Sequence, residues 1–287
     1  MSWLIVLQGL LFAAIDVFTK IALLKVPVFV FVCVRMGLTS CLLLLLFGRT
    51  IIRDLKTVSP RHYILPAACL SISILMSNLA VHLTAATSFA FIRSLTAVIA
   101  PLLMTLFFNR KYTIRDAVIQ SVLVAGLYLL CAKGGLTQFG IGEVLAFLCA
   151  VLAAVSLVFG ADALNYVDPY TLTFFQMAGS CVLSFMIALI DGSFATAWYA
   201  GFADPQVVTI LMYNVLIGSM VGYIIQNKVL KKVSPKTVGI TQCAYPVFTA
   251  LIANFFLGEM LSAQGFAGAF IIIACIIAQA FNQSENN

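Results

Sequence analysis

The segment Pro27–Gly48, PVFVFVCVRMGLTSCLLLLLFG, is the plainest guide to the class of this protein. It runs for 22 residues with a single formal charge, Arg35. A helix of about 20 mostly apolar residues crosses the hydrocarbon core of a bilayer. The segment therefore predicts a transmembrane helix, and similar apolar runs recur along the whole chain.

The composition extends this prediction to the complete chain. Hydrophobic residues make up 63% and charged residues 9% of the 287 positions, whereas soluble domains hold about 25% charged residues. This excludes a soluble enzyme, a disordered chain and a nucleic-acid binder. Walker, GxSxG and HExxH motifs are absent from the sequence, so we expect no enzyme, no catalytic residue, no cofactor and no metal. The eight cysteines lie in apolar runs without CxxC or Cys/His spacing and are interpreted as small hydrophobic residues.

Ten spans are expected, each an apolar run bounded by a turn or a charge. Pro27, Pro169 and Pro205 stand where a helix can begin. The expected spans cover residues 3–24, 27–48, 63–83, 86–108, 114–132, 141–161, 169–190, 206–227, 236–257 and 263–281. The sequence thus predicts an all-α membrane protein with ten transmembrane helices.

Basic residues give the expected orientation. With the N-terminus in the cytoplasm, eleven of them fall in inside loops: Arg49, Arg53, Lys56, Arg61, Arg110, Lys111, Arg115, Lys228, Lys231, Lys232 and Lys236. Lys25 and Lys133 fall outside. This bias toward the inside predicts an integral protein of the cell (inner) membrane with both termini cytoplasmic.

An internal repeat is expected between the two halves. A shift of 149 residues sets Asn78–Thr113 on Asn227–Ser262 and places Arg93 on Gln242. A shift of 141 sets Arg35 on Gln176. Five spans followed by five more start on opposite sides of the membrane, which is typical of transporters with inverted repeats. We therefore expect two inverted five-helix repeats, residues 1–135 and 136–287.

Several short motifs mark the second half of the chain. They are Tyr213-Asn214 followed by Gly218–Tyr223, the basic turn Lys231–Pro235, Tyr245–Phe248, Leu257–Glu259, and the Asp168-Pro169 opening of the seventh span. These motifs resemble the drug/metabolite transporter superfamily, in its ten-helix EamA-type branch. The resemblance covers nearly the whole chain. It implies metabolite transport, commonly export, and a fourth span that lines a central cavity.

The first half departs from the pattern of that family. Ala97 stands where a proline is expected, Pro101 follows one turn later, and Asn109-Arg110 replaces Gly-Glu. We therefore expect the bend of the fourth helix and the contacts of its cytoplasmic end to differ from those of relatives.

Two arginines within spans are the first candidates for the substrate site. A charge at the bilayer centre costs at least about 2.5–3.5 kcal/mol on insertion scales, so each needs an explanation. Arg35 and Arg93 lie about eight residues into the second and fourth spans. Both are interpreted as a cationic wall for a carboxylate or phosphate; the alternative is a structural ion pair or carbonyl cap.

Asp16 and Lys20 share a face of the first span because they are four residues apart. One interpretation is a self-neutralised ion pair near the outer end. The other makes Asp16 a proton-titrating or cation-pairing group that leaves Lys20 when substrate arrives.

Amides and tyrosines complete the candidate substrate-binding set. Asn78, Gln176 and Gln242 could bond substrate, although amides in spans also join helices. Tyr223 and Tyr245 could stack on an aromatic or cationic substrate, with packing as the alternative.

The predicted function is a secondary transporter of a small organic metabolite that works by alternating access, with an amino acid or related zwitterion or anion favoured by the arginines. The alternatives are a multidrug or organic-cation exporter and a membrane-embedded enzyme or lipid-handling scaffold. The expected partners are the substrate, the lipid bilayer and a coupling proton or sodium ion, but no nucleic acid. The chain is expected to act as a monomer or a homodimer.

Overall fold

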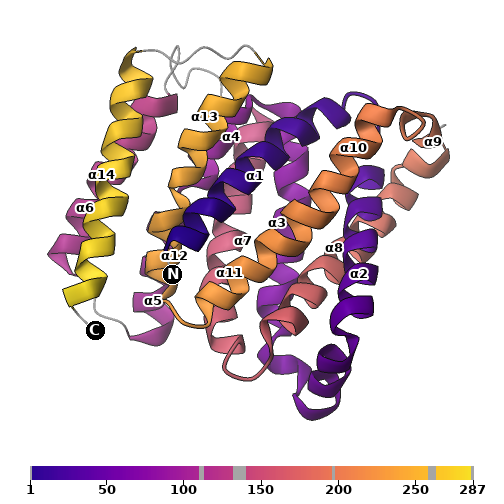
Figure 1. Ribbon diagram of the computed structural model, residues 1–287, viewed down its shortest axis with the longest axis horizontal. Helices are drawn as coiled ribbons and strands as arrows, with labels where there is room; N and C mark the ends of the chain where they lie inside the picture. Colours follow the sequence, from indigo (N-terminus) through magenta and orange to yellow (C-terminus); the bar gives the residue numbers. More distant parts are fainter. Residues whose placement is uncertain (1, 110–112, 132–139, 196–197, 258–262, 286–287) are drawn as a thin grey trace.

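The computed structural model describes residues 2–109, 113–131, 140–195, 198–257 and 263–285. The described elements are all helical (Figure 1). They are α1 (Ser2–Ala22), α2 (Val28–Thr57), η1 (Pro60–His62), α3 (Ile64–Leu83), α4 (Ala86–Arg93), α5 (Thr96–Phe108), α6 (Ile114–Cys131), α7 (Ile141–Ala163), α8 (Pro169–Ile190), η2 (Ser193–Ala195), α9 (Trp198–Gly201), α10 (Pro205–Tyr213), the π-helix η3 (Asn214–Gly222), α11 (Tyr223–Leu230), α12 (Pro235–Gln242), α13 (Ala244–Leu257) and α14 (Ala263–Glu285).

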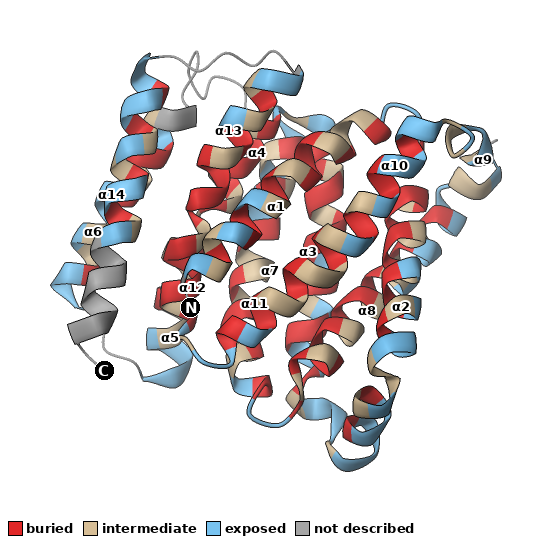
Figure 2. Ribbon diagram, viewed as in Figure 1, coloured by how far each residue is buried: buried red, intermediate tan, exposed pale blue. Residues whose placement is uncertain are grey.

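Length and hydropathy identify this as an integral membrane protein. Among the described residues, eight helical segments are long and apolar enough to cross a bilayer, and Ala263–Ile277 forms a shorter apolar helix. The outward faces of the helices are exposed while their inward faces are buried (Figure 2). Large apolar side chains such as Leu45 and Phe255, which are 81% and 89% exposed, lie on these outward faces, where lipid can cover them.

Helices lie at the expected positions, but α6 is not among the eight segments above and α14 contains only the shorter apolar helix, so ten membrane crossings stay a prediction. The helices also differ from the expected bounds at the end of α2 and are interrupted at three places. The second span was expected to end at Gly48, but α2 continues to Thr57. This extension has a structural use, because the Asp54 carboxylate accepts hydrogen bonds from the Asp168 backbone N–H at 2.8 Å and the Thr171 hydroxyl at 2.7 Å. The polar end of α2 thereby fixes the start of α8.

Two long helices are broken at matching places. The fourth span divides into α4 and α5 after Arg93, and the ninth divides into α12 and α13 after Gln242, which is 149 residues later. Pro246 has no N–H for the Gln242 carbonyl, which explains the second break. In the first half, Ala97 occupies the position that corresponds to Pro246. The Thr96 hydroxyl there donates a hydrogen bond to the Arg93 carbonyl at 2.7 Å. The eighth span is interrupted by the π-helix η3.

Helices from the two halves of the chain pack against one another. α2 lies along α8, α6 along α14, and α5 against α12 (Figure 1). α1 packs against α13 and against η3. Gly218 and Gly222 face Ile15 and Phe12 of α1 so closely that an added Cβ would lie 2.1 and 2.6 Å from their side chains. These glycines therefore serve close helix packing.

Ion pairs join helix ends outside the core. Lys25, after α1, contacts the Asp204 carboxylate at 2.5 Å at the start of α10. That hydrogen bond from Lys25 lowers the pKa of Asp204. Lys236 at the start of α12 pairs with Asp116 at the start of α6. The ends of α2 and α11, which carry Arg53 and Lys228, lie at the same end of the bundle (Figure 1). Arg110, Lys111, Lys133 and Gly258-Glu259 fall outside the described residues.

Candidate functional site

A pocket lies in the interior of the bundle where the two broken helices meet. Residues of α1, α3, α4, α5, α7, α11, α12 and α13 line it, and it leaves about 590 Å³ of space between atoms. The α1 residues that line it are Gln8, Gly9 and Phe12.

Arg93 and Asp16 form a buried ion pair beside this pocket. Arg93 Nη1 lies 3.7 Å from Asp16 Oδ2, and the side chains are 19% and 11% exposed. The Tyr245 hydroxyl donates a hydrogen bond to the same carboxylate oxygen. Arg93 is the last residue of α4, and its guanidinium contacts Asp16 of α1 and the Tyr245 ring of α13.

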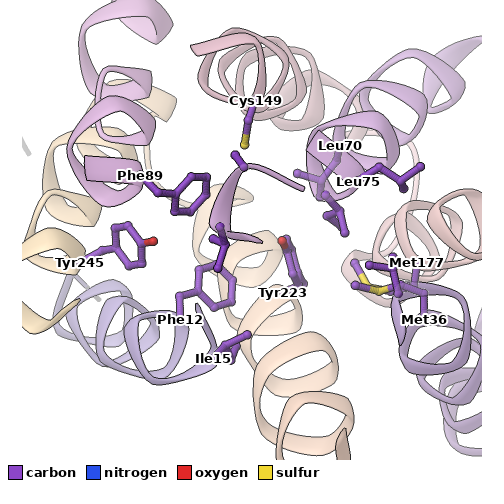
Figure 3. Packing of buried hydrophobic residues seen from close by; sticks show 14 of the residues in the cluster. Phe12, Ile15, Met36, Leu70, Leu75, Phe89, Cys149, Met177, Tyr223 and Tyr245 are labelled. Atoms are coloured by element: carbon purple, nitrogen blue, oxygen red, sulfur yellow. The ribbon is translucent and has the colours of Figure 1, made fainter. Parts of the chain in front are cut away.

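Aromatic rings surround the Arg93 guanidinium. Its Cζ atom lies 5.3 Å from the Tyr245 ring centroid, 5.6 Å from that of Phe12 and 5.9 Å from that of Phe89. Figure 3 shows Phe12, Phe89, Tyr223 and Tyr245 converging on a common centre, with both phenol oxygens turned inward. Rings within about 6 Å attract a cation. These three rings form an aromatic cage, and the Arg93 guanidinium is the cation that they surround.

Arg35 is the second buried cation. It is 5% exposed on α2, and its Nε atom has no hydrogen-bond partner within the described part of the chain. Its ionisable neighbours are Tyr223, Asp16 and Arg93. Arg35, Arg93 and Asp16 together carry two positive charges and one negative charge, so this buried group has a net charge of +1.

The expected ion pair between Asp16 and Lys20 is not formed. Lys20 Nζ instead donates to the Thr84 carbonyl at 2.9 Å, at the C-terminal end of α3, where a cation is favoured. Asp16 faces Arg93 and Tyr245. The interpretation of these two residues as a self-neutralised pair was wrong, because each found a better placed partner on another helix.

Three glutamines form a hydrogen-bonded ring on another wall of the pocket. Gln8 Nε2 donates to Gln226 Oε1 at 2.7 Å. Gln242 Nε2 donates to Gln226 Oε1 at 3.1 Å and to Gln8 Oε1 at 3.2 Å. The ring joins α1, α11 and α12, and all three residues line the pocket.

Two predicted amides lie away from this pocket. The Gln176 amide oxygen accepts a hydrogen bond from Asn227 Nδ2 at 3.0 Å, between α8 and α11. Asn78 Nδ2 donates to the Ile74 carbonyl of its own helix at 2.7 Å. Neither is among the residues that line the pocket, whereas the predicted Arg93, Gln242, Tyr223 and Tyr245 are.

The sequence interpretation missed Gln8, Phe12 and Phe89 and gave Gln226 no role in the site. One signal could have found two of them, because Gln8, Phe12 and Asp16 follow at intervals of four and share one face of α1. No group of three His, Cys, Asp or Glu that could hold a metal ion occurs within the ranges that the structure describes.

Comparison with known proteins gives a consistent picture. Residues 1–132 and 140–279 match the model of the EamA-like transporter family. Two proteins of Archaeoglobus fulgidus, each named an uncharacterized transporter, are 26% and 27% identical over 68% and 56% of this chain. These matches span 60% and 56% of the relatives' own lengths. One crystal structure, described only as that of a protein, has a TM-score of 0.73 at 16% identity over 98% of both chains, which shows a shared fold.

Proposed function

Because the chain belongs to the EamA-like transporter family, we propose that this membrane transporter is a secondary transporter of a small organic metabolite with an anionic group. An amino acid or a related zwitterion or anion fits best. The buried charge carries this proposal: within the described residues, Asp16 is the one acidic side chain that opposes Arg35 and Arg93. An uncompensated charge is costly in a bilayer, so a bound carboxylate would lower that cost.

Alternating access between two inverted five-helix repeats is the proposed mechanism. Two observations support it. The breaks after Arg93 and Gln242 are 149 residues apart, the shift at which the sequence aligns with itself. Counterpart spans of the ten-span scheme also touch: α2 with α8, α5 with α12 and α6 with α14. Such repeats place the substrate site near the midplane between the halves.

The proposed orientation puts both termini in the cytoplasm of a cell with this protein in its inner membrane. The basic ends of α2 and α11 lie at one end of the bundle, which supports this orientation (Figure 1).

Export of an organic cation fits the site less well. The aromatic cage of Phe12, Phe89 and Tyr245 would suit such a ligand, but it already surrounds Arg93. A second cation would also meet two arginines and one carboxylate.

Flux into proteoliposomes tests the proposal. Purified full-length protein is assayed with a panel of amino acids, organic anions, nucleosides and organic cations under imposed proton and sodium gradients. We expect flux of at least one carboxylate above that of empty liposomes. Flux of cations without any carboxylate flux would overturn the proposal.

A further inference from the structure

The glutamine ring leaves hydrogen-bonding groups that the protein does not use. Gln226 Oε1 accepts two hydrogen bonds, one from Gln8 and one from Gln242, so both its lone pairs are engaged. Within the described residues, no hydrogen bond uses Gln226 Nε2 as donor or Gln242 Oε1 as acceptor. In this part of the chain, a ligand in the pocket could therefore use the Gln226 N–H and the Gln242 C=O, neither of which is among the fully enclosed side-chain atoms that lack a partner.

These groups belong to side chains in the wall of the pocket, where Gln226 is buried and Gln242 is half-buried. Gln8 has no exposed surface and Gln226 is 8% exposed, and both line the pocket. A buried polar group without a partner costs about as much as a lost hydrogen bond. If the oxygen and nitrogen atoms of all three side-chain amides were exchanged, the three hydrogen bonds of the ring would be preserved. Gln226 would then have an unused C=O group and Gln242 an unused N–H group. Either way, the wall offers a donor together with an acceptor.

The glutamine ring and Arg93 face the same small space. Cys243, next to Gln242, has its Sγ 3.9 Å from the carbonyl of Ser94, next to Arg93. The two helix breaks therefore touch, and Arg93, Gln226 and Gln242 line one pocket. One small molecule can reach the guanidinium with one end and the amide wall with the other.

We propose that Gln226 and Gln242 form a subsite for an amide-type group, –CO–NH–, of a substrate whose carboxylate binds at Arg93. This rests on the proposed function and narrows its substrate class to small carboxylates that carry a primary amide, a lactam or a ring imide. An amide group presents a C=O to the Gln226 N–H and an N–H to the Gln242 C=O. A thioether or a plain hydrocarbon of the same size leaves both protein groups unpaired, and sites of this kind reject such analogues strongly.

Binding to the purified full-length protein in detergent tests the subsite through ligand-induced rises in Tm, which report affinity. Two matched pairs serve as probes: L-glutamine against L-methionine, and orotate against benzoate. Each pair shares a carboxylate, and only the first member has an amide or imide group. We expect the first member of at least one pair to bind about tenfold tighter. Parity within both pairs would overturn the proposal.

Variants separate this subsite from a general effect of losing an amide. Gln226→Met should bring the affinity ratio of the preferred pair close to one while binding of the second member changes less than about twofold. Gln206→Met is the matched control, since this amide bonds Lys25 at 3.3 Å at the exposed start of α10, and it should keep the full ratio. An unchanged ratio in Gln226→Met would refute the subsite.

A ligand-side measurement covers the case in which Gln226→Met does not fold. The γ-methyl ester of L-glutamate keeps the carbonyl of L-glutamine and lacks its N–H donor. If glutamine is the preferred probe, the ester should bind the unmodified protein about tenfold more weakly; for orotate, N-methylation of the ring imide makes the same test. Equal affinity would count against the subsite. Failure of the proposed function is distinct, because it is read as absent carboxylate flux in proteoliposomes.

Discussion

Arg93 and Gln242 end equivalent helices, α4 and α12, yet they build two different walls of one pocket. We call the group Arg35, Arg93 and Asp16 the arginine side, and the group Gln8, Gln226 and Gln242 the amide side. On the arginine side the formal charges do not cancel, and Arg35 Nε has no hydrogen-bond partner among the residues that the structure describes. On the amide side the three side chains satisfy most of one another's bonds. Under the proposed function, the same backbone break would provide attraction for a charge in one half and hydrogen-bond selection in the other.

The largest expected effect on carboxylate flux comes from replacing Arg93 by glutamine, the residue that stands at position 242 on the amide side. Arg93→Gln should lower carboxylate flux about 10- to 100-fold, because the charged hydrogen-bond donor is lost. It should also destabilise the protein by about 3–5 kcal/mol, since Asp16 is left as an unpaired buried charge. Proteoliposome flux and denaturation of the purified protein measure the two effects.

A double variant separates these two losses. Arg93→Gln combined with Asp16→Asn should recover most of the stability and none of the flux. Recovery of flux together with stability would mean that Arg93 is only structural.

Asp16→Asn should have the opposite effect on binding. Asp16 occupies Arg93 when no substrate is bound, so removing its charge should tighten carboxylate binding about tenfold, or about 1.4 kcal/mol. Ligand-induced rises in Tm measure this change. Unchanged affinity, together with loss of any response of flux to a pH gradient, would instead assign Asp16 to proton coupling.

Arg35 and Gln176 occupy equivalent positions and should respond in opposite directions to the same substitution. Arg35→Met should raise stability by about 1–3 kcal/mol because it removes a buried charge, and it should weaken carboxylate binding. Gln176→Met should lower stability by about 1–2 kcal/mol, because Asn227 loses a bonding partner, and leave flux within about twofold. Equal losses of flux in both variants would contradict the difference between the two positions.

The smallest effect is expected far from both sides, at Lys25 and Asp204. The pKa of Asp204 is lowered, so its contribution to stability is present above the ordinary aspartate pKa near 3.9 and is lost as the pH falls through the lower folded-state pKa. Asp204→Asn should remove this acid dependence and change Tm slightly, because exposed pairs contribute little. Melting curves from pH 3 to pH 7 at low and high salt measure it, and a loss of flux in this variant would show that the pair has a further role.

Much of the fold could be predicted because apolar runs and their boundaries are local properties of the sequence. The bounds expected for residues 169–190 are those of α8. The break after Arg93 was harder to foresee, because Ala97 holds the position where Pro246 explains the break in α12. There the Thr96 hydroxyl also bonds the Ala150 carbonyl on α7, 54 residues away, at 3.1 Å. A contact of that range leaves no local pattern.

The sequence indicated which residue types belong to the site. It was a poorer guide to which of these side chains bond one another. Buried charges are rare enough to be noticed, which brought Arg93 and Asp16 into the candidate set. Their partnership depends on how α1 meets α4, and helical spacing suggested Lys20 for Asp16 instead. Gln8 lies near the start of a span, where an amide attracts little notice until Gln226 and Gln242 are seen beside it.

α1 carries Gln8 and Asp16 on one face, and this arrangement links the two walls energetically. A carboxylate that draws Arg93 away from Asp16 releases α1 at one wall, and the same helix holds Gln8 in the ring at the other. Occupancy of either wall then changes the free energy of binding at the other, and this coupling must be reciprocal. A molecule that carries both a carboxylate and an amide group should therefore have a more favourable binding free energy than the sum of the values for the two separate groups. This cooperativity should vanish when Gln8 no longer bonds Gln226.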